Sequence, residues 1–251
     1  MDFIFDENRL TNTFNKLNKY DTINLVWKRG LCKASRTGHG SNLFDLLEPI
    51  SHIDFFNKLI EYSTKNINTK TIYNRGLTLE ESFNLAKEFK QSVEDLNNSI
   101  QFNIEDYLDY IVYVNVIQTF DGHINEVMLV NYIKKYYYPD AHKASGELDS
   151  KYGIDILYRN DTRGVQVKSI NFFLGQKQST INDRQNIKTL KEEVNDKFNI
   201  DMKYAIFDRK TFKYIKNVNN TPIFSFDEFQ ELLNCKQFPH KVLKLPQMSV
   251  E

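Results

Sequence analysis

The sequence predicts an α/β protein in which a mostly helical N-terminal region precedes an αββαβ unit. In the first half of the chain, apolar residues recur three and four residues apart, as they do along one face of a helix. From about residue 120, such segments alternate with short ones in which every second residue is apolar, as in strands. We therefore expect a helical region over 1–115, the αββαβ unit over 116–216 and a helical tail over 217–251.

The composition fits a globular chain with a substantial core. Only 9 of 251 residues are Gly and 5 are Pro, whereas 19 are Phe and 14 are Tyr, which excludes global disorder. Lys and Arg together equal Asp and Glu at 33 each, so net charge neither favours nor excludes a polyanionic partner. Cys32 and Cys235 lack metal-ligand spacing and indicate reduced thiols. With an acidic N-terminus and no long apolar run, we expect a cytoplasmic protein without a membrane contact.

The segment Trp27–Asn42, WKRGLCKASRTGHGSN, is predicted to be a loop because glycines and small polar residues interrupt any period. It is also the most basic stretch of the first half. Arginine and lysine contact phosphates and base edges, and glycine permits close approach of the backbone. The alternative is a solvated surface loop. The candidate DNA-binding residues here are Lys28, Arg29, Lys33 and Arg36.

Two amphipathic helices follow this segment. The first is expected over Asp54–Thr64, and the second over Thr78–Ile100. Thr78 and Glu81 have the spacing of a capping box, in which each side chain accepts a hydrogen bond from the backbone of the other. Both helices should bury one apolar face.

The second half contains the elements of the αββαβ unit in order. They are a helix over Ile124–Tyr137, a strand over Gly153–Tyr158, a turn over Arg159–Gly164, a strand over Gly164–Phe172, a helix over Asn182–Phe198 and a strand over Met202–Asp208.

Three polar residues of the predicted hairpin share one face. Side chains alternate along a strand, so Asp155 lies opposite to the face of Ile154, Ile156 and Tyr158. On the second strand, Gln166 and Lys168 likewise lie opposite to Val165 and Val167. If the strands pair through the short turn, a carboxylate, an amide oxygen and an ammonium group converge.

This trio has the chemistry that phosphodiester hydrolysis requires. Mg²⁺ prefers oxygen ligands, and Asp155 with the Gln166 carbonyl can supply two of them while water and a phosphate oxygen fill the rest. Lys168 can orient the attacking water and stabilise the charge that develops on the phosphate. An ordinary hairpin with a solvated polar face is the alternative.

These residues resemble the restriction-endonuclease-like PD-(D/E)xK nucleases. Asp155 matches the motif aspartate, Gln166 stands where Glu or Asp is usual, and Lys168 matches the lysine two residues later. Glu126 matches the acidic residue that many members place on the first core helix as a further metal ligand. The resemblance covers roughly residues 120–210 and implies the αββαβ core with a mixed central sheet, Mg²⁺ as cofactor and attack by a metal-activated water.

The Gln-x-Lys variant looks most like that of some type II restriction endonucleases. The resemblance therefore implies sequence-specific cleavage of double-stranded DNA by a homodimer, and allows a cognate DNA methyltransferase in the same system without direct contact. Two identical subunits are the simplest way to cut both strands of a palindrome. A second group of DNA-contacting residues is expected in Leu174–Arg184, which contains Lys177 and Arg184.

Two departures from the family pattern leave alternatives open. No proline directly precedes Asp155, and the neutral Gln166 removes one negative charge unless Glu126, Glu147 or Asp149 compensates. Glu126 has a second explanation, because an acidic residue in the first turn of a helix is favourable by itself. The other functional hypotheses are a structure-specific repair, recombination or mobile-element nuclease, and a catalytically inactive DNA-binding protein. The recognition sequence and the cut position do not follow from the sequence.

Overall fold

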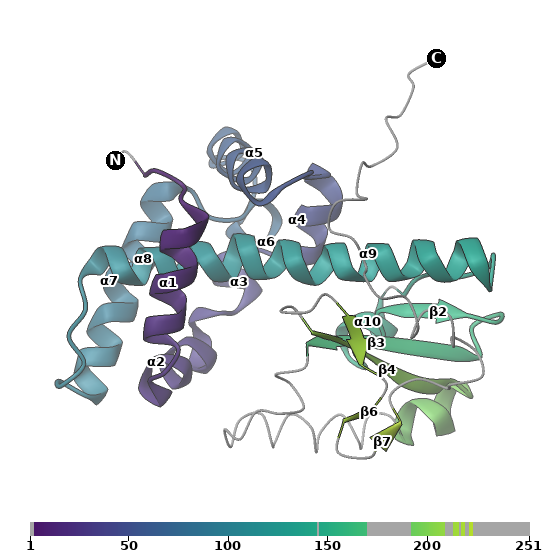
Figure 1. Cartoon of the computed structure of the whole chain (residues 1–251). Helices are drawn as coiled ribbons and strands as arrows, with labels where there is room; N and C mark the ends of the chain where they lie inside the picture. Colours follow the sequence, from purple (N-terminus) through teal and green to yellow (C-terminus); the bar gives the residue numbers. More distant parts are fainter. Residues whose placement is uncertain are drawn as a thin grey trace. The chain divides into compact units, whose positions relative to one another are not determined.

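The computed structural model describes residues 3–144, 146–169, 192–208, 213–215, 217–218 and 221–222, with the side chains of a few of these, Lys168 among them, outside the description (Figure 1). The chain is a mixed α/β protein. It divides into two units, Met1–His123 and Ile124–Glu251, and the division falls within helix α9. In the described part, no helix combines the length and the apolar character needed to cross a membrane.

The described part of the first unit is helical. Its elements are α1 (Glu7–Leu17), α2 (Asp21–Val26), the π-helix η1 (Trp27–Leu31), α3 (Ala34–Thr37), α4 (Gly40–Leu47), α5 (His52–Lys65), α6 (Ile72–Arg75), α7 (Leu79–Leu96), α8 (Ile104–Val112), the π-helix η2 (Tyr113–Gln118) and the start of α9 (Thr119–Tyr136).

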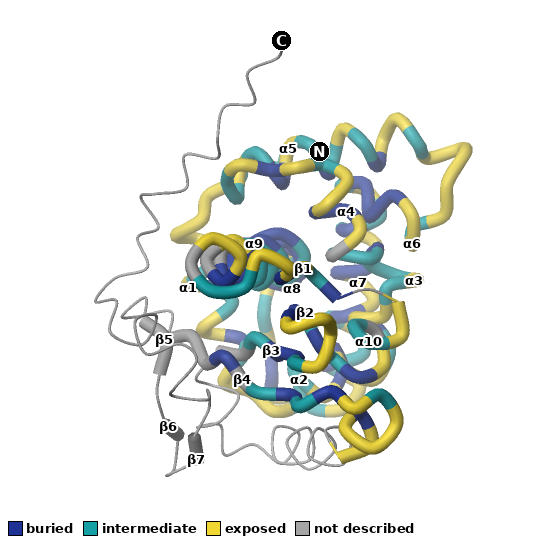
Figure 2. Tube along the Cα trace, turned by 90° about the vertical axis from the view of Figure 1, so that its right-hand side faces the viewer, coloured by how far each residue is buried: buried dark blue, intermediate teal, exposed yellow. Residues whose placement is uncertain are grey.

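The core of this unit is rich in aromatic rings. Phe89 of α7 is fully buried, and its ring lies 5.4 Å from Trp27, 5.1 Å from Tyr107 and 5.4 Å from Tyr110. Tilted and edge-to-face arrangements of this kind are the favourable ones for aromatic pairs. In Figure 2, helices such as α5 show buried residues on one side and exposed residues on the other, as their apolar periodicity predicts.

Both amphipathic helices predicted in the first half are confirmed. α5 extends the first prediction by a few residues, and α7 begins as predicted after Thr78 but ends at Leu96. The capping box is present in full. The Thr78 hydroxyl accepts from the Glu81 amide at 3.2 Å, and the Glu81 carboxylate accepts from the Thr78 amide at 2.9 Å.

The prediction of a loop over residues 27–42 is wrong. The segment forms η1, α3 and the start of α4, with non-helical dihedral angles at Gly30 inside η1. Two glycines serve helix packing there. A Cβ at Gly38 would overlap the backbone of Gly76, and a Cβ at Gly40 would lie 2.9 Å from Thr119. Glycine therefore marks close approach of backbones in this segment, which a sequence pattern does not distinguish from a loop.

The second unit contains a mixed five-stranded sheet with the strand order β1-β2-β3-β4-β5. Its elements after α9 are β1 (His142–Lys143), α10 (Glu147–Ser150), β2 (Ile156–Tyr158), β3 (Arg163–Ser169), a helical segment over 192–198, β4 (Asp201–Asp208) and β5 (Lys213–Ile215). Strands β1, β2 and β3 are antiparallel neighbours, whereas β4 runs parallel to β3. Parallel neighbours need a crossover connection, and the helical segment directly precedes β4.

Apolar side chains cover both faces of this sheet. On one face, Ile156, Val165 and Ala205 pack against residues of α9 that include Leu129 and Ile133. The opposite face carries a second cluster. It consists of Ala144, Tyr152, Ile154, Leu157, Val194, Ile200 and Met202, with Leu148 and Phe198 packed against it. Val194 belongs to the 192–198 helical segment, so helices contribute to the cover on both faces.

The predicted elements of the second half are present with shifted ends. α9 starts at Thr119 because it continues η2 without a break, and β2 starts at Ile156. The predicted turn occupies residues 159–162, three of which have positive φ. The predicted strand beyond Ser169 and most of the predicted helix over Asn182–Phe198 lie outside the described residues. So does most of the predicted C-terminal helical tail, whose described residues, 217–218 and 221–222, instead form the paired strands β6 (Asn217–Val218) and β7 (Thr221–Pro222).

Candidate functional site

Asp155 lies directly before β2 and contacts β3 through its side chain. The Asp155 amide donates to the Val165 carbonyl at 2.9 Å, and the Asp155 carboxylate accepts from the Val167 amide at 2.5 Å. Val167 lies between Gln166 and Lys168 in the sequence of β3. The structure therefore brings the Asp155 carboxylate to the part of β3 that carries the other two residues of the predicted trio.

The strand alternation breaks at Asp155. Ile156 packs in the cluster with α9, whereas Ile154 packs with Leu157 in the cluster on the opposite face. The prediction that Ile154 shares a face with Ile156 and Tyr158 is therefore wrong. The physical reason is that the Asp155 carboxylate, rather than a backbone carbonyl, takes the Val167 amide, and such side-chain bonds compete with the regular ladder.

Gln166 is buried in β3 with an unsatisfied oxygen. Its neighbour Val165 packs in the cluster with α9, so Gln166 lies on the opposite face, and only 3 % of it is exposed. No hydrogen-bond donor among the described residues reaches its side-chain oxygen Oε1. Leaving a buried acceptor unpaired costs about 1–3 kcal/mol. Such an atom in a native fold has room for a further partner, such as a water molecule or an ion.

Gly153 makes room for the Gln166 amide. Its φ of +67° lies in the left-handed region, and a Cβ at this position would overlap Nε2 of Gln166. Gly153 thus satisfies two constraints, a backbone conformation that side chains disfavour and a close contact. From the sequence, Gly153 was predicted only as the first residue of the strand over Gly153–Tyr158.

Lys168 lies in β3 two residues after Gln166, and its Cα pairs with that of Ile206 in β4. Its side chain is outside the description. Positions 166 and 168 are two residues apart in β3, and alternation along a strand assigns such positions to the same face.

Glu126 is on α9 and contacts β1. Its carboxylate oxygen Oε2 lies 4.0 Å from Nζ of Lys143, and its side chain is 17 % exposed. Lys143 pairs in register with Ile156, and the next residue, Ala144, donates its amide to the Asp155 carbonyl at 3.0 Å. Lys143 therefore links the helix that carries Glu126 to the strand segment that carries Asp155. Lys143 was not among the residues predicted for the site, because a two-residue strand has no detectable period.

Glu147 belongs to a separate surface network. It forms ion pairs with Lys197 at 3.3 Å and Lys151 at 3.5 Å, and these lysines hold its pKa below the ordinary value. Tyr152 donates to Glu193 at 2.9 Å in the same network. The structure thus gives Glu147 a role on the surface of the second unit. The Asp149 carbonyl accepts a hydrogen bond from the Gly153 amide at 2.9 Å.

The candidate DNA-binding residues of the first unit lie on η1 and α3. Lys28, Arg29 and Lys33 are exposed. Arg36 forms an ion pair with Glu88 of α7, so its charge is already balanced. Lys177 and Arg184, the candidates of the second group, lie outside the described residues.

The donor set beside Asp155 fits a hard divalent cation. A carboxylate and an unpaired amide oxygen are ligands that Mg²⁺ accepts, and Mg²⁺ takes only one or two protein carboxylates when water and phosphate complete its shell. Within the described part of the chain, no group of three or more His, Cys, Asp or Glu side chains is arranged to hold a metal ion. The candidate ligands remain Asp155, Gln166 and Glu126, and the Glu126 carboxylate also lies 4.0 Å from Nζ of Lys143.

Comparison of the chain with family models, with curated proteins and with solved structures finds no match.

Proposed function

We propose that this chain is a Mg²⁺-dependent endonuclease that hydrolyses double-stranded DNA at specific sequences, as type II restriction endonucleases do. The observation that supports the proposal most is the contact between the Asp155 side chain and strand β3. The Asp155 carboxylate lies against the Val167 amide, and the neighbouring Gln166 oxygen is buried without a described donor. A carboxylate and an unsatisfied amide oxygen together favour a divalent cation over a purely structural hairpin.

The order of elements in the second unit also supports the proposal. Apart from the two-residue strand β1 and the short helix α10, which lie between α9 and β2, the described elements α9, β2, β3, the helical segment over 192–198 and β4 have the αββαβ order that the resemblance implies. The sheet is mixed, because β2 is antiparallel and β4 parallel to β3. The specific restriction-endonuclease-like fold is part of the proposal.

In the proposed site, Asp155 and Gln166, with Glu126 as a further ligand, would hold the ion, and Lys168 would orient the attacking water. A bound Mg²⁺ would lower the pKa of that water and balance the negative charge of the phosphate. The Lys168 ammonium would donate to the water and to a phosphate oxygen as charge develops. Gly153 leaves the space that the Gln166 amide occupies. Glu126 would adjust the charge of the site through Lys143.

The proposal assigns DNA contacts to two separate groups of cations. Lys28, Arg29 and Lys33 supply exposed positive charge in the first unit. Lys177 and Arg184 follow the proposed catalytic strand in the sequence. Cleavage of both strands by a homodimer, and a methyltransferase that protects the same sequence, belong to the same proposal.

The proposal is tested with mixed plasmid and phage DNA incubated with Mg²⁺ or with EDTA. We expect discrete bands with Mg²⁺ and intact DNA with EDTA. Lys168→Ala should lower the cleavage rate by at least about 100-fold, because a positioned proton donor contributes 10²–10⁴ in rate, and should keep DNA binding. Lys65→Ala is the matched control, since Lys65 is exposed on α5 and paired with Glu61.

Three results would contradict the proposal. Cutting that persists in EDTA would exclude the metal, and cutting of branched DNA alone would favour a structure-specific nuclease. A Lys168→Ala variant that equals the Lys65→Ala variant in every assay would favour a DNA-binding protein without catalysis.

A further inference from the structure

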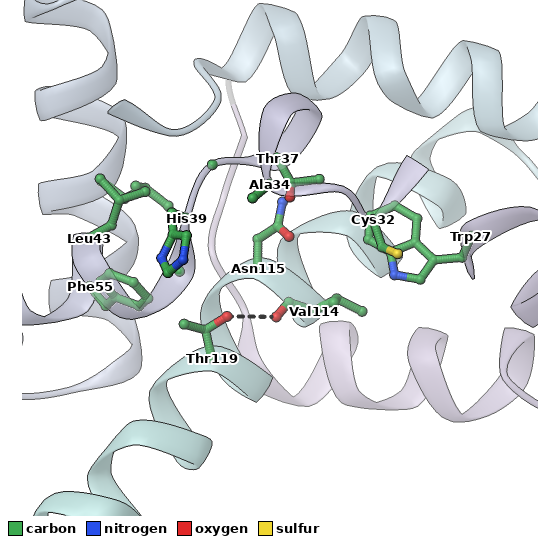
Figure 3. A pocket seen from close by; sticks show the side chains of 13 residues that line it. Trp27, Cys32, Ala34, Thr37, His39, Leu43, Phe55, Val114, Asn115 and Thr119 are labelled. Carbon is green, nitrogen blue, oxygen red and sulfur yellow. Dashed lines mark hydrogen bonds between the residues drawn. The ribbon is translucent and has the colours of Figure 1, made fainter. Parts of the chain in front are cut away.

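The first unit contains a cavity of about 280 Å³ (Figure 3). None of the residues that line it is among those proposed for catalysis. Its walls come from the segment between η1 and α4, from α5 and from η2. Leu43 and Phe55 supply apolar surface, Trp27 closes one end, and Asn115 and Thr119 supply polar groups.

The π-helix η2 sets the position of the polar wall. A π-turn breaks the regular hydrogen bonding of a helix, and such turns are frequent at functional sites. The Thr119 hydroxyl donates to the Val114 carbonyl at 3.3 Å, which satisfies a backbone group next to the cavity (Figure 3). Asn115 follows Val114 and presents its side-chain amide to the cavity (Figure 3).

The Asn115 amide makes no hydrogen bond to any residue in the described part of the chain. It is half-buried, so part of its surface is withdrawn from water. An amide offers a donor and an acceptor side by side, and both remain available here. This arrangement fits a ligand with a complementary donor and acceptor pair.

The other polar groups of the cavity have defined roles. Nδ1 of His39 accepts from the Asn42 amide at 3.4 Å, so in the neutral ring the proton is on Nε2, which can donate. The hydroxyl of Thr37 donates to the Lys33 carbonyl at 3.3 Å, as Thr119 does to Val114, so both oxygens can still accept. The cavity therefore offers acceptors, an imidazole donor and one unpaired amide between apolar walls.

We propose that this cavity binds an adenine base. Adenine presents an amino donor at N6 beside an acceptor at N7, and asparagine pairs with both groups at once. The ring faces would lie against apolar walls that include Leu43 and Phe55. The volume of about 280 Å³ lies just below the usual range for ligand pockets, about 300–1,000 Å³, and suits one base better than a larger ligand.

The base could come from a free nucleoside or from DNA in which the nucleotide is extruded from the stack. Both sources present the same chemistry to Asn115. The inference goes beyond the proposed nuclease activity and does not depend on it, because every residue involved belongs to the first unit.

The test uses Trp27, which is the only tryptophan of the chain and lines the cavity. The full-length protein is titrated with adenosine, guanosine and thymidine, and with a DNA duplex that carries 2-aminopurine, a fluorescent analogue of adenine. We expect a saturable change in Trp27 emission with adenosine, or a rise in 2-aminopurine emission as the base leaves the stack. The first result assigns a free nucleoside and the second a base in DNA, and either one supports the proposal.

A matched pair of variants locates the binding. Asn115→Ala should weaken adenine binding at least tenfold, whereas Asn84→Ala, on an exposed position of α7, should bind as the wild type does. Cys32 gives a second measurement on the unmodified fold, because it lines the cavity and is exposed. Bound adenosine or adenine-containing DNA should slow the alkylation of Cys32 relative to that of Cys235.

The proposal is overturned if neither adenosine nor the 2-aminopurine duplex gives a saturable signal. It is also overturned if Asn115→Ala binds as tightly as Asn84→Ala, or if guanosine and thymidine bind as well as adenosine. In these cases the Asn115 amide does not select adenine.

Discussion

Arg75 in the first unit and Gln166 in the second are both almost completely buried polar residues, at 4 % and 3 % exposure. Arg75 is held by the Glu81 carboxylate at 2.6 Å and donates to the carbonyls of Lys70 and Gly76. Gln166, by contrast, keeps a side-chain oxygen that no described donor reaches. A buried polar group that is hydrogen-bonded within the protein, as Arg75 is, contributes to the fold and needs no further partner. An unsatisfied acceptor beside a carboxylate has room for a cation, and this difference underlies the assignment of Gln166 to the proposed site.

The largest effect is expected from breaking the satisfied pair. Glu81→Ala leaves the buried Arg75 guanidinium without its counter-charge and removes the capping box, so unfolding should become easier by about 3 kcal/mol or more. Glu80→Ala, at an exposed position in the same turn, should cost less than about 1 kcal/mol. Urea unfolding followed by Trp27 emission reports the first unit and measures both. Equal losses would mean that the pair contributes nothing specific.

Gly153→Ala should have the next largest effect. The substitution forces an alanine into positive φ and drives its Cβ into the Gln166 amide. Gly146→Ala is the matched control, because Gly146 has a similar φ of +62° but open space around a Cβ. Both variants should lose about 1–2 kcal/mol of folding stability to backbone strain. Gly153→Ala should lose additional stability through the overlap with Gln166, and it alone should lose DNA cleavage. Thermal unfolding and a cleavage assay of both variants measure the difference, and identical behaviour would remove the role given to Gly153.

Gln166→Met should raise the stability of the fold, whereas Glu81→Ala should lower it. The change replaces an unsatisfied amide by an apolar side chain of similar shape, so the second unit should gain on the order of 1 kcal/mol. Hydrogen exchange of the β2 and β3 amides is the measurement. Gln91→Met, at an exposed position of α7, serves as the control and should change stability by less than about 0.5 kcal/mol. A clear loss of protection in β3 would show that the Gln166 oxygen has a partner in the folded protein.

The smallest expected effect is the pH dependence that His52 gives to the stability of the first unit. Burial lowers the pKa of His52, but hydrogen bonds and charges from Asp121 and Glu7 more than offset this and raise it above 6.5. Because the folded-state pKa is the higher one, the His52 contribution to stability is complete below pH 6.5 and is lost as the pH rises through the folded value. His52→Gln should therefore flatten the stability profile above pH 6.5, by less than about 1 kcal/mol. An unchanged profile would show that His52 is not charged in the fold.

The sequence predicted the features that depend on neighbours in the chain. The capping box of Thr78 and Glu81 is an example, because both partners lie within one helical turn and their spacing fixes the geometry. The apolar periodicity likewise predicted α5, α7 and β4. These elements follow from local pattern, which is why their types were correct and their ends shifted by a few residues.

The features that depend on distant partners could not be predicted. Gly38 and Gly40 indicated a loop, yet they allow helices to approach Gly76 and Thr119. The contact of the Asp155 carboxylate with the Val167 amide depends on where β2 ends against β3, which alternation alone does not specify. The two π-helices leave no periodic signal, so the cavity beside η2 and the half-buried amide of Asn115 were not among the expectations.

Binding of a divalent ion to the DNA-free protein tests the central claim most directly. Titration with Mn²⁺, read as loss of the electron paramagnetic resonance signal of the free ion, should show saturable binding by the wild type. We expect Asp155→Asn to abolish this binding and Gln166→Met to weaken it about tenfold, while Glu80→Ala leaves it unchanged. Binding that is the same in all four proteins, or no saturable binding in the wild type, would contradict the assignment of Asp155 and Gln166 as metal ligands.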